Sequence, residues 1–258
     1  MKKNILIVLV LIGAYACQRP VSTKSGKETW VFLMAGQSNM AGRGVIEASD
    51  TITHPRILTI DKDYQLIRAK EPIHFYEPNM KGLDCGLSFA QNLIKELNDS
   101  VTILLIPTAV GGSSSKQWLR DTVHRHVKLL TNFREKMAFA KTQGIVKGIL
   151  WHQGESDANP AATQVYTENL KKLFSTFRTY AANDKLPIFI GELGTYSKTP
   201  EQWNHINEAI RQYVSTDPYS FLISTADLQH KGDFVHFNSE GQRIMGKRFA
   251  EAFLKTMK

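Results

Sequence analysis

Short, nearly continuous apolar runs alternate along the chain with longer stretches in which apolar residues recur at helical spacing. Each apolar run is rich in Val, Ile, Leu, Phe or Trp, as expected for strands covered on both faces of a parallel sheet. The runs cover residues 29–35, 101–107, 146–151, 187–193 and 220–226. The amphipathic stretches are predicted helices, and they cover residues 87–97, 122–141, 163–181, 202–213 and 239–257.

This alternation predicts an α/β fold in three layers, with a five-stranded parallel sheet between helices. Residues 46–82 break the pattern. Two short extra strands are predicted there, at 56–60 and 64–69, followed by an irregular connection. We interpret the segment as an insertion after the first strand that forms a wall of a pocket. Ser239 and Gln242 have the spacing of a capping box for the last helix.

The first 28 residues have the pattern of an export signal and a tether. Two lysines precede a short apolar stretch and a set of small residues that ends at Cys17. The apolar stretch is too short for a permanent membrane span, so residues 1–16 are a predicted signal peptide. The cut site resembles that of bacterial lipoproteins, which would make Cys17 the lipidated first residue; a cut elsewhere would leave a soluble exported protein.

Residues 17–28 are polar and predict a flexible tether, and residues 29–258 have the length of one domain. The expected location is therefore outside the cytoplasm, in the periplasm or on the cell surface, with a membrane anchor on Cys17. The sequence says nothing about the oligomeric state.

Composition excludes several other classes of protein. The formal net charge is +8, but no run of Lys and Arg is interleaved with aromatic residues, so a nucleic-acid partner is not expected. The second cysteine, Cys85, lies in an apolar context and is a predicted core residue. Neither a His-Glu-x-x-His nor a Cys-x-x-Cys pattern is present, so neither a catalytic metal nor another cofactor is expected.

Polar, glycine-rich stretches follow four of the predicted strands. In an open α/β fold the carboxyl ends of the strands meet at one edge of the sheet, where such folds bind their ligands. The four stretches cover residues 36–40, 108–118, 152–157 and 227–238. Together they hold a serine, glycines, a glutamine amide and an Asp/His cluster, which we expect to share one crevice.

These residue types are those that acyl transfer requires. A serine hydroxyl is a weak nucleophile until a base, most often His, takes its proton, and a carboxylate then orients the imidazole. The developing oxyanion needs fixed hydrogen-bond donors. Ser38 is the candidate nucleophile, and the pairs Asp227/His230 and Asp233/His236 have the same spacing. His236 is favoured as the base, and His230 is then a loop residue that lines the cleft.

Four motifs resemble those of one enzyme group. They are Gly-Gln-Ser-Asn-Met-Ala-Gly at 36–42, Gly-Gly-Ser at 111–113 with Trp118, His-Gln-Gly-Glu-Ser-Asp at 152–157, and Asp-x-x-His-Phe at 233–237. In this order they resemble the sialate O-acetylesterase, or carbohydrate esterase family 6, group of the SGNH hydrolases. The resemblance implies a flavodoxin-like fold and a metal-free Ser–His–Asp mechanism that removes acetyl groups from carbohydrate hydroxyls.

The resemblance also implies residue roles. Ser38 is the nucleophile, His236 the base and Asp233 its partner. The oxyanion donors are the N–H of Ser38, the N–H of Gly112 or Gly111, and the amide of Gln153, which stands where many SGNH enzymes have an asparagine.

Other residues near these motifs are candidates for substrate binding or support, with alternatives left open. Glu155 is either a second triad acid or a brace for its loop, and Trp118 either stacks on a sugar or packs in the core. Arg43 could pair with a substrate carboxylate, although the family pattern often has Arg here. The remaining candidates are Gln37, Asn39 as a cap of the nucleophile turn, and His152 as a structural or cleft-lining residue.

The sequence therefore predicts a serine esterase that deacetylates a glycan through an acetyl-enzyme. Acetylated xylan, sialic acid and related glycans are all open as substrates. Two other interpretations use the same scaffold: an inactive carbohydrate-binding surface lipoprotein, and a lipase or thioesterase.

Overall fold

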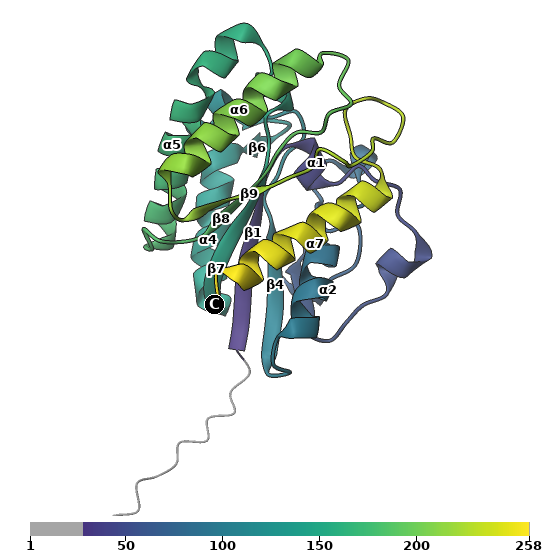
Figure 1. The fold of residues 1–258 in the computed structure, drawn as a ribbon. Coiled ribbons are helices and arrows are strands. Elements are labelled where there is room, and N and C mark those ends of the chain that lie inside the picture. Colours follow the sequence, from purple (N-terminus) through teal and green to yellow (C-terminus); the bar gives the residue numbers. More distant parts are fainter. Residues whose placement is uncertain (1–27, 258) are drawn as a thin grey trace, which may run out of the picture.

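A seven-stranded sheet forms the centre of the protein, which we describe from a computed structural model over residues 28–257 (Figure 1). The predicted signal peptide and Cys17 lie outside the described residues. The strands of the sheet are β1 (Glu28–Gly36), β2 (Ile57–Ile60), β3 (Leu66–Arg68), β4 (Val101–Pro107), β7 (Ile145–His152), β8 (Ile188–Gly191) and β9 (Ser220–Ile223). Their order is β3-β2-β4-β1-β7-β8-β9, and every neighbouring pair is parallel except β2 and β3.

The prediction of five strands is wrong, because the two short strands of the insertion join the sheet. β2 pairs with β4 in parallel, so the outer edge of β4 finds partners for its main-chain groups. β3 then returns antiparallel to β2 around a turn in which the Asp61 carboxylate accepts the N–H groups of Asp63 and Gln65, both at 2.9 Å. The five strands predicted from the apolar runs are all present and parallel.

Helices cover both faces of this sheet, which confirms the three-layer prediction. α2 (Gly86–Glu96) and α7 (Ser239–Lys255) pack together on one face, and α3 (Ser115–Leu119), α4 (Leu129–Gln143), α5 (Pro160–Ala181) and α6 (Pro200–Thr216) cover the other (Figure 1). Short helical segments are α1 (Ser38–Ala41), η1 (Ala48–Thr51), η2 (Pro78–Met80) and η3 (Glu155–Asp157).

Two local predictions about the helices are wrong. The start of the predicted helix 122–141 forms a hairpin of β5 (Val123–His124) and β6 (Val127–Lys128), because Arg125 and His126 have φ of 47° and 66°, outside the helical region. The cap of α7 is Asn238, whose side chain accepts the N–H of Gly241 at 2.8 Å, while the Ser239 hydroxyl donates to the carbonyl of Val45.

Alternate side chains of β1 supply both halves of the hydrophobic core. Val31, Leu33 and Ala35 face the layer of α3–α6, and Phe32 and Met34 face α2 and α7. All five are fully buried, as the period-2 geometry of a central strand requires. The amphipathic helices therefore bury their apolar faces on the same strand from opposite sides.

The strand order determines where a site can lie. If only the five strands first predicted are counted, their order is 2-1-3-4-5, the flavodoxin-like arrangement. β1 lies between β4 and β7, so the loops that follow β4 and β7 flank the residues that follow β1. The segments at 36–40, 108–118 and 152–157 are therefore neighbours in space.

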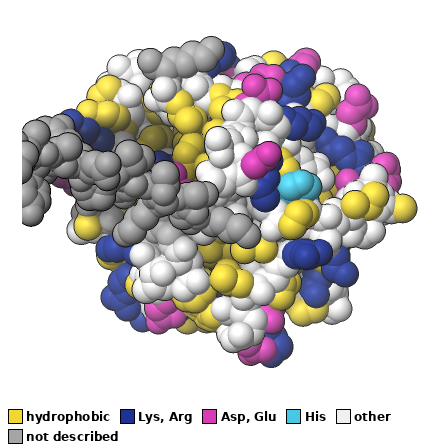
Figure 2. All heavy atoms as spheres, turned by 90° about the horizontal axis from the view of Figure 1, so that it is seen from below, with side chains coloured by type: hydrophobic (Ala, Val, Ile, Leu, Met, Phe, Trp, Pro, Cys, Tyr) yellow, Lys and Arg dark blue, Asp and Glu magenta, His cyan; other side chains and the backbone are white. Residues whose placement is uncertain are grey.

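The charged groups are spread over the surface seen from below in Figure 2. On that face Lys and Arg side chains lie among acidic and apolar ones. In residues 28–257 no helix combines the length and the apolar character needed to cross a membrane.

Gly36 offers a test of how the end of β1 is packed. A Cβ at this position would collide with the main-chain carbonyl of His152, and φ is 135°. Gly232 also has a positive φ, 111°, but a Cβ there would meet nothing within 4 Å. We expect Gly36→Ala to lower the free energy of unfolding by about 1–3 kcal/mol more than Gly232→Ala, measured by urea denaturation, since both strain the backbone and only one clashes. Equal losses would contradict this packing.

Candidate active site

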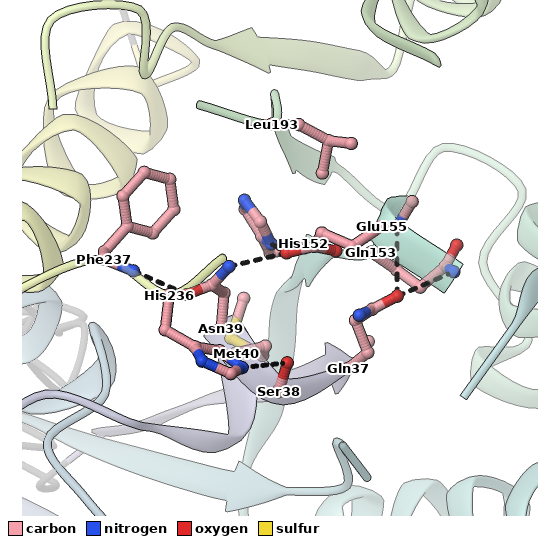
Figure 3. A network of polar contacts seen from close by, with 12 residues as sticks. Gln37, Ser38, Asn39, Met40, His152, Gln153, Glu155, Leu193, His236 and Phe237 are labelled. Atoms are coloured by element: carbon pink, nitrogen blue, oxygen red, sulfur yellow. Dashed lines mark hydrogen bonds and ion pairs between the residues drawn. The ribbon is translucent and has the colours of Figure 1, made fainter. Parts of the chain in front are cut away.

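Ser38, His236 and Asp233 lie in a hydrogen-bonded row above the end of β1. Ser38 is the first residue of α1, and its Oγ lies 3.0 Å from Nε2 of His236 (Figure 3). Nδ1 of His236 lies 2.7 Å from a carboxylate oxygen of Asp233. The nucleophile, base and acid predicted from the sequence are thus within hydrogen-bonding distance of one another, although Ser38 and His236 are far apart in the chain.

The loop before α7 fixes the Asp233 carboxylate. Its Oδ1 accepts the N–H groups of Val235 at 3.0 Å and of His236 at 2.8 Å, while Oδ2 faces the imidazole. Burial would raise the pKa of Asp233, but the hydrogen bonds from His236 and Val235 outweigh it and hold the pKa at about 2. Asp233 is therefore ionised at neutral pH and can orient and stabilise a protonated imidazole.

Asn39 ties the nucleophile helix to the base. Its side-chain nitrogen donates to Glu155 at 2.6 Å and to the carbonyl of Val235 at 3.1 Å, and its oxygen accepts the N–H of Phe237 at 3.0 Å (Figure 3). The prediction that Asn39 caps the turn is wrong, because it lies inside α1 and bonds across the site instead. It holds the residues on both sides of His236 against the helix that carries Ser38.

The glycine loop after β4 contains a candidate main-chain donor for an oxyanion. The N–H of Gly111 donates to Glu77 at 2.7 Å and is thus engaged. Gly112 is exposed with φ of 75°, and its N–H has no acceptor in the described part of the chain. The N–H of Ser38 opens α1, where main-chain donors lack helical partners. Of the two glycines left open by the sequence, Gly112 is the one that can serve an oxyanion.

The structure contradicts the assignment of Gln153 as an oxyanion donor. Gln153 is fully buried, and its nitrogen donates to the carbonyl of Ser113 at 3.1 Å, to Asp157 at 2.6 Å and to the side-chain oxygen of Gln37 at 3.1 Å. Its oxygen accepts from Tyr166 at 2.9 Å. Both hydrogens of the amide are engaged inside the protein, because the loop after β7 turns the side chain under the glycine loop. Gln153 is a brace between loops.

Glu155 also braces its loop, the second of the two roles that the sequence left open. Its Oε1 accepts from Asn39 and lies 3.8 Å from Nδ1 of His152 (Figure 3). His152 is fully buried, with Nε2 2.9 Å from the carbonyl of Glu192, and burial lowers its pKa. In the described part of the chain neither residue is hydrogen-bonded to His236, whose carboxylate partner is Asp233.

The second Asp/His pair has two structural roles. Nδ1 of His230 accepts the N–H groups of Gly232 at 2.9 Å and Phe234 at 3.2 Å, which shapes the loop that carries His236. Asp227 binds Arg248 on the surface at 2.7 Å. The two pairs are alike in spacing, but only Asp233 and His236 reach Ser38.

Arg43 is turned inward, which argues against its pairing with a substrate carboxylate. It is buried and donates to Glu77 at 2.8 Å, and burial lowers its pKa to about 10. Glu77 also binds Arg125 and the N–H of Gly111. The sequence analysis did not identify Glu77, although a carboxylate next to two aromatic residues in the insertion could have indicated a buried charged group. It connects the insertion to the glycine loop.

The aromatic residue at the site's rim is Phe234, which the sequence analysis also missed. Trp118 is fully buried, packs against Trp151, and donates to Ser113 at 2.9 Å, so the alternative of a sugar-stacking Trp118 is wrong. Phe234 is 41% exposed, has φ of 61° and stacks on His230. The position of Phe234 between Asp233 and His236 was the only feature of the sequence that pointed to a role at the site.

No group of three or more His, Cys, Asp or Glu side chains that could hold a metal ion occurs within residues 28–257.

Comparison with known proteins gives consistent matches. A family model described as "Carbohydrate esterase, sialic acid-specific acetylesterase" matches residues 28–255. A probable carbohydrate esterase of Arabidopsis thaliana is 30% identical over 245 residues, which is 87% of this chain and 90% of that protein. The X-ray structure of the Arabidopsis protein has a TM-score of 0.78 at 25% identity and covers 89% of this chain and 99% of that chain.

Two further structures share the fold. NanS has a TM-score of 0.72 at 19% identity, covering 90% of this chain and 98% of its own. A carbohydrate acetylesterase of Xanthomonas citri has a TM-score of 0.66 at 16% identity, covering 87% of this chain and 55% of its own. The flavodoxin-like fold that the motif resemblance implied agrees with the observed strand order and with these matches.

The Glu77 cluster predicts a large difference between a buried and an exposed ion pair. Glu77→Ala leaves the buried Arg43 without its carboxylate, so we expect a loss of about 3–5 kcal/mol in the free energy of unfolding. Asp63→Ala removes the partner of Lys62 in an exposed pair and should have no measurable effect. Urea denaturation of both variants measures the contrast. A Glu77→Ala protein as stable as the Asp63→Ala protein would show that the cluster does not hold the insertion.

Proposed function

The chain belongs to the carbohydrate esterase family of sialic acid-specific acetylesterases, and on this premise we propose that it removes O-acetyl groups from a carbohydrate through a covalent acetyl-enzyme. The observation that carries the proposal is the position of His236, with one ring nitrogen on Ser38 and the other on Asp233. This is the arrangement in which a base can remove the serine proton while its own charge is stabilised.

In the first half of the reaction, Ser38 Oγ attacks the acetyl carbonyl carbon and its proton passes to Nε2 of His236. A bond forms between Oγ and the carbon, and the carbonyl electron pair moves onto the oxygen. We assign the N–H groups of Ser38 and Gly112 to stabilise this oxyanion, since Ser38 opens α1 and Gly112 is exposed. The intermediate collapses when the bond to the sugar oxygen breaks, and His236 gives its proton to that oxygen.

In the second half, a water molecule gives a proton to Nε2 of His236 as its oxygen attacks the acetyl carbon. The bond to Ser38 Oγ then breaks, the proton on His236 returns to Ser38, and acetic acid leaves and loses its remaining acidic proton to solvent. Asp233 keeps its negative charge throughout, consistent with its low pKa.

The rim of the site supports a carbohydrate substrate. Phe234 presents an exposed ring two residues from His236. The backbone of Phe234 has a positive φ, a left-handed conformation that is unusual for a bulky residue. An aromatic face packs well against the C–H groups of a sugar ring. We propose that the leaving sugar lies on this side of the site.

Ser38→Ala removes the nucleophile and should lower kcat on an aryl acetate by roughly 10⁵–10⁶, to near background, while the protein remains folded. Ser49→Ala, at an exposed serine, is the control and should retain full activity. The same assay with octanoate esters tests for a lipase or thioesterase, and acetate release from acetylated xylan and O-acetylated sialic acid tests for the sugar. Undiminished hydrolysis by Ser38→Ala would overturn the mechanism.

Asp233→Asn should lower kcat at neutral pH by roughly 10³–10⁴, because an amide cannot stabilise the imidazolium and favours the wrong tautomer of His236. The chain provides a matched control in Asp227→Asn, since Asp227 belongs to the pair of identical spacing but binds Arg248. That variant should keep its activity. Steady-state kinetics on the aryl acetate compares the two, and equal rates in both variants would remove Asp233 from the mechanism.

A further inference from the structure

We propose that the side-chain amide of Gln37 donates a hydrogen bond to the oxyanion, in the role that the sequence had suggested for Gln153. The inference rests on the proposed function, because it concerns the same tetrahedral intermediate at Ser38. Four observations support it: the orientation of the Gln37 amide, its unused nitrogen, its position beside Ser38, and the engagement of Gln153.

The orientation of the Gln37 amide is fixed by main-chain groups. Its Oε1 accepts the N–H groups of Ser156 at 3.2 Å and Gly154 at 3.4 Å, as well as the amide of Gln153 at 3.1 Å. A main-chain N–H can only donate, so the atom that faces Gly154 and Ser156 must be the oxygen. The nitrogen Nε2 therefore points away from the loop after β7.

Nε2 of Gln37 has no acceptor in the described part of the chain. Only 2% of the residue is exposed, yet Nε2 is not among the polar atoms that are sealed in the interior without a partner. Because an amide donor in such a confined place is unfavourable without an acceptor, this nitrogen is suited to meet a ligand atom. In Figure 3 it lies on the side of the amide that faces Ser38.

The position of Gln37 is set by its place in the chain. It follows Gly36 and immediately precedes Ser38, and its own N–H donates to the carbonyl of His152 at 2.9 Å. The side chain is thus held from both ends, by β7 at the main chain and by the loop after β7 at Oε1. A donor that is fixed before the substrate arrives needs no reorganisation when the negative charge develops.

Gln153 is the amide to which the motif resemblance had given the oxyanion role, and it supports Gln37. Its nitrogen bonds to Oε1 of Gln37, to Ser113 and to Asp157. We therefore assign three oxyanion donors: the N–H of Ser38, the N–H of Gly112 and Nε2 of Gln37. When Ser38 Oγ adds to the acetyl carbon, the electron pair of the broken π bond is shared among these three hydrogen bonds.

Gln37→Glu is the sharpest test. The new carboxylate keeps an acceptor for Gly154, Ser156 and Gln153, but it replaces the donor by an oxygen. We expect kcat on an aryl acetate to fall by about 10²–10³ with KM nearly unchanged, since the lost bond forms only in the transition state. Gln37→Met removes the donor without adding charge and should show the same loss, so it decides the question if Gln37→Glu does not fold.

Gln117→Glu is the matched control. Gln117 also accepts a main-chain N–H with its oxygen, from Ser114 at 2.8 Å, and its nitrogen faces His124 rather than Ser38. The same chemical change at this position should leave kcat and KM as in the unmodified protein.

A second readout separates loss of the oxyanion donor from general damage. Trifluoroacetone adds to a serine hydroxyl and forms a tetrahedral oxyanion, so its inhibition constant should rise in Gln37→Glu by the same factor by which kcat falls. If Gln37→Glu and Gln37→Met keep kcat within about threefold of the unmodified protein, the inference is wrong. In that case an inactive Ser38→Ala variant still supports the proposed esterase, whereas an active one overturns the proposed function itself.

Discussion

The parallel pairing of β1 with β4 on one side and β7 on the other is the constraint on which the site depends. It places the residue after Gly36 between the two loops that leave the neighbouring strands. The close approach of Gly36 to the His152 carbonyl leaves no room for a side chain, so the chain can turn from strand into α1 directly over β7. Ser38, the glycine loop and the loop with Gln153 and Glu155 therefore meet without long connections.

Most of this framework could be predicted from the sequence, because the five buried strands are continuous apolar runs and the motif resemblance implied a flavodoxin-like order for them. The strand count was wrong because strands at an edge are short and weakly patterned: all three residues of β3 are exposed, and its pairing depends on the Asp61 turn. The β5–β6 hairpin was missed because it depends on the positive φ of Arg125 and His126, residues whose types give little sign of it.

Within the site, too, some features could be predicted from the sequence and others could not. Ser38 and the Asp233/His236 pair were identified because the carboxyl ends of parallel strands converge and because spacing and motif single them out. The roles of Gln153, Arg43 and Trp118 could not be derived in this way, because each depends on which buried atom the side chain meets. Gln37 and Gln153 both lie in the sequence motifs, and the direction of their hydrogen bonds is the basis on which we propose Gln37 as the oxyanion donor and Gln153 as its support.

Three carboxylates at the edge of the site show how the loops are held. Glu77 accepts the glycine-loop N–H and two arginines, Asp157 accepts Ser115 and Gln153, and Glu155 accepts Asn39. Burying a carboxylate is unfavourable unless donors satisfy it, and each of these accepts at least one donor from another segment of the chain. Since the carboxylates are partnered by loops rather than by a ligand, they fix the reacting groups in advance and leave the ligand to the exposed ones. On the proposed mechanism, Ser38, Gly112 and Gln37 act at the acetyl group, and Phe234 is the residue that we propose to contact the sugar. The chemistry at the acetyl group would then be common to all substrates, and discrimination between sugars would depend on Phe234 and the loops beside it.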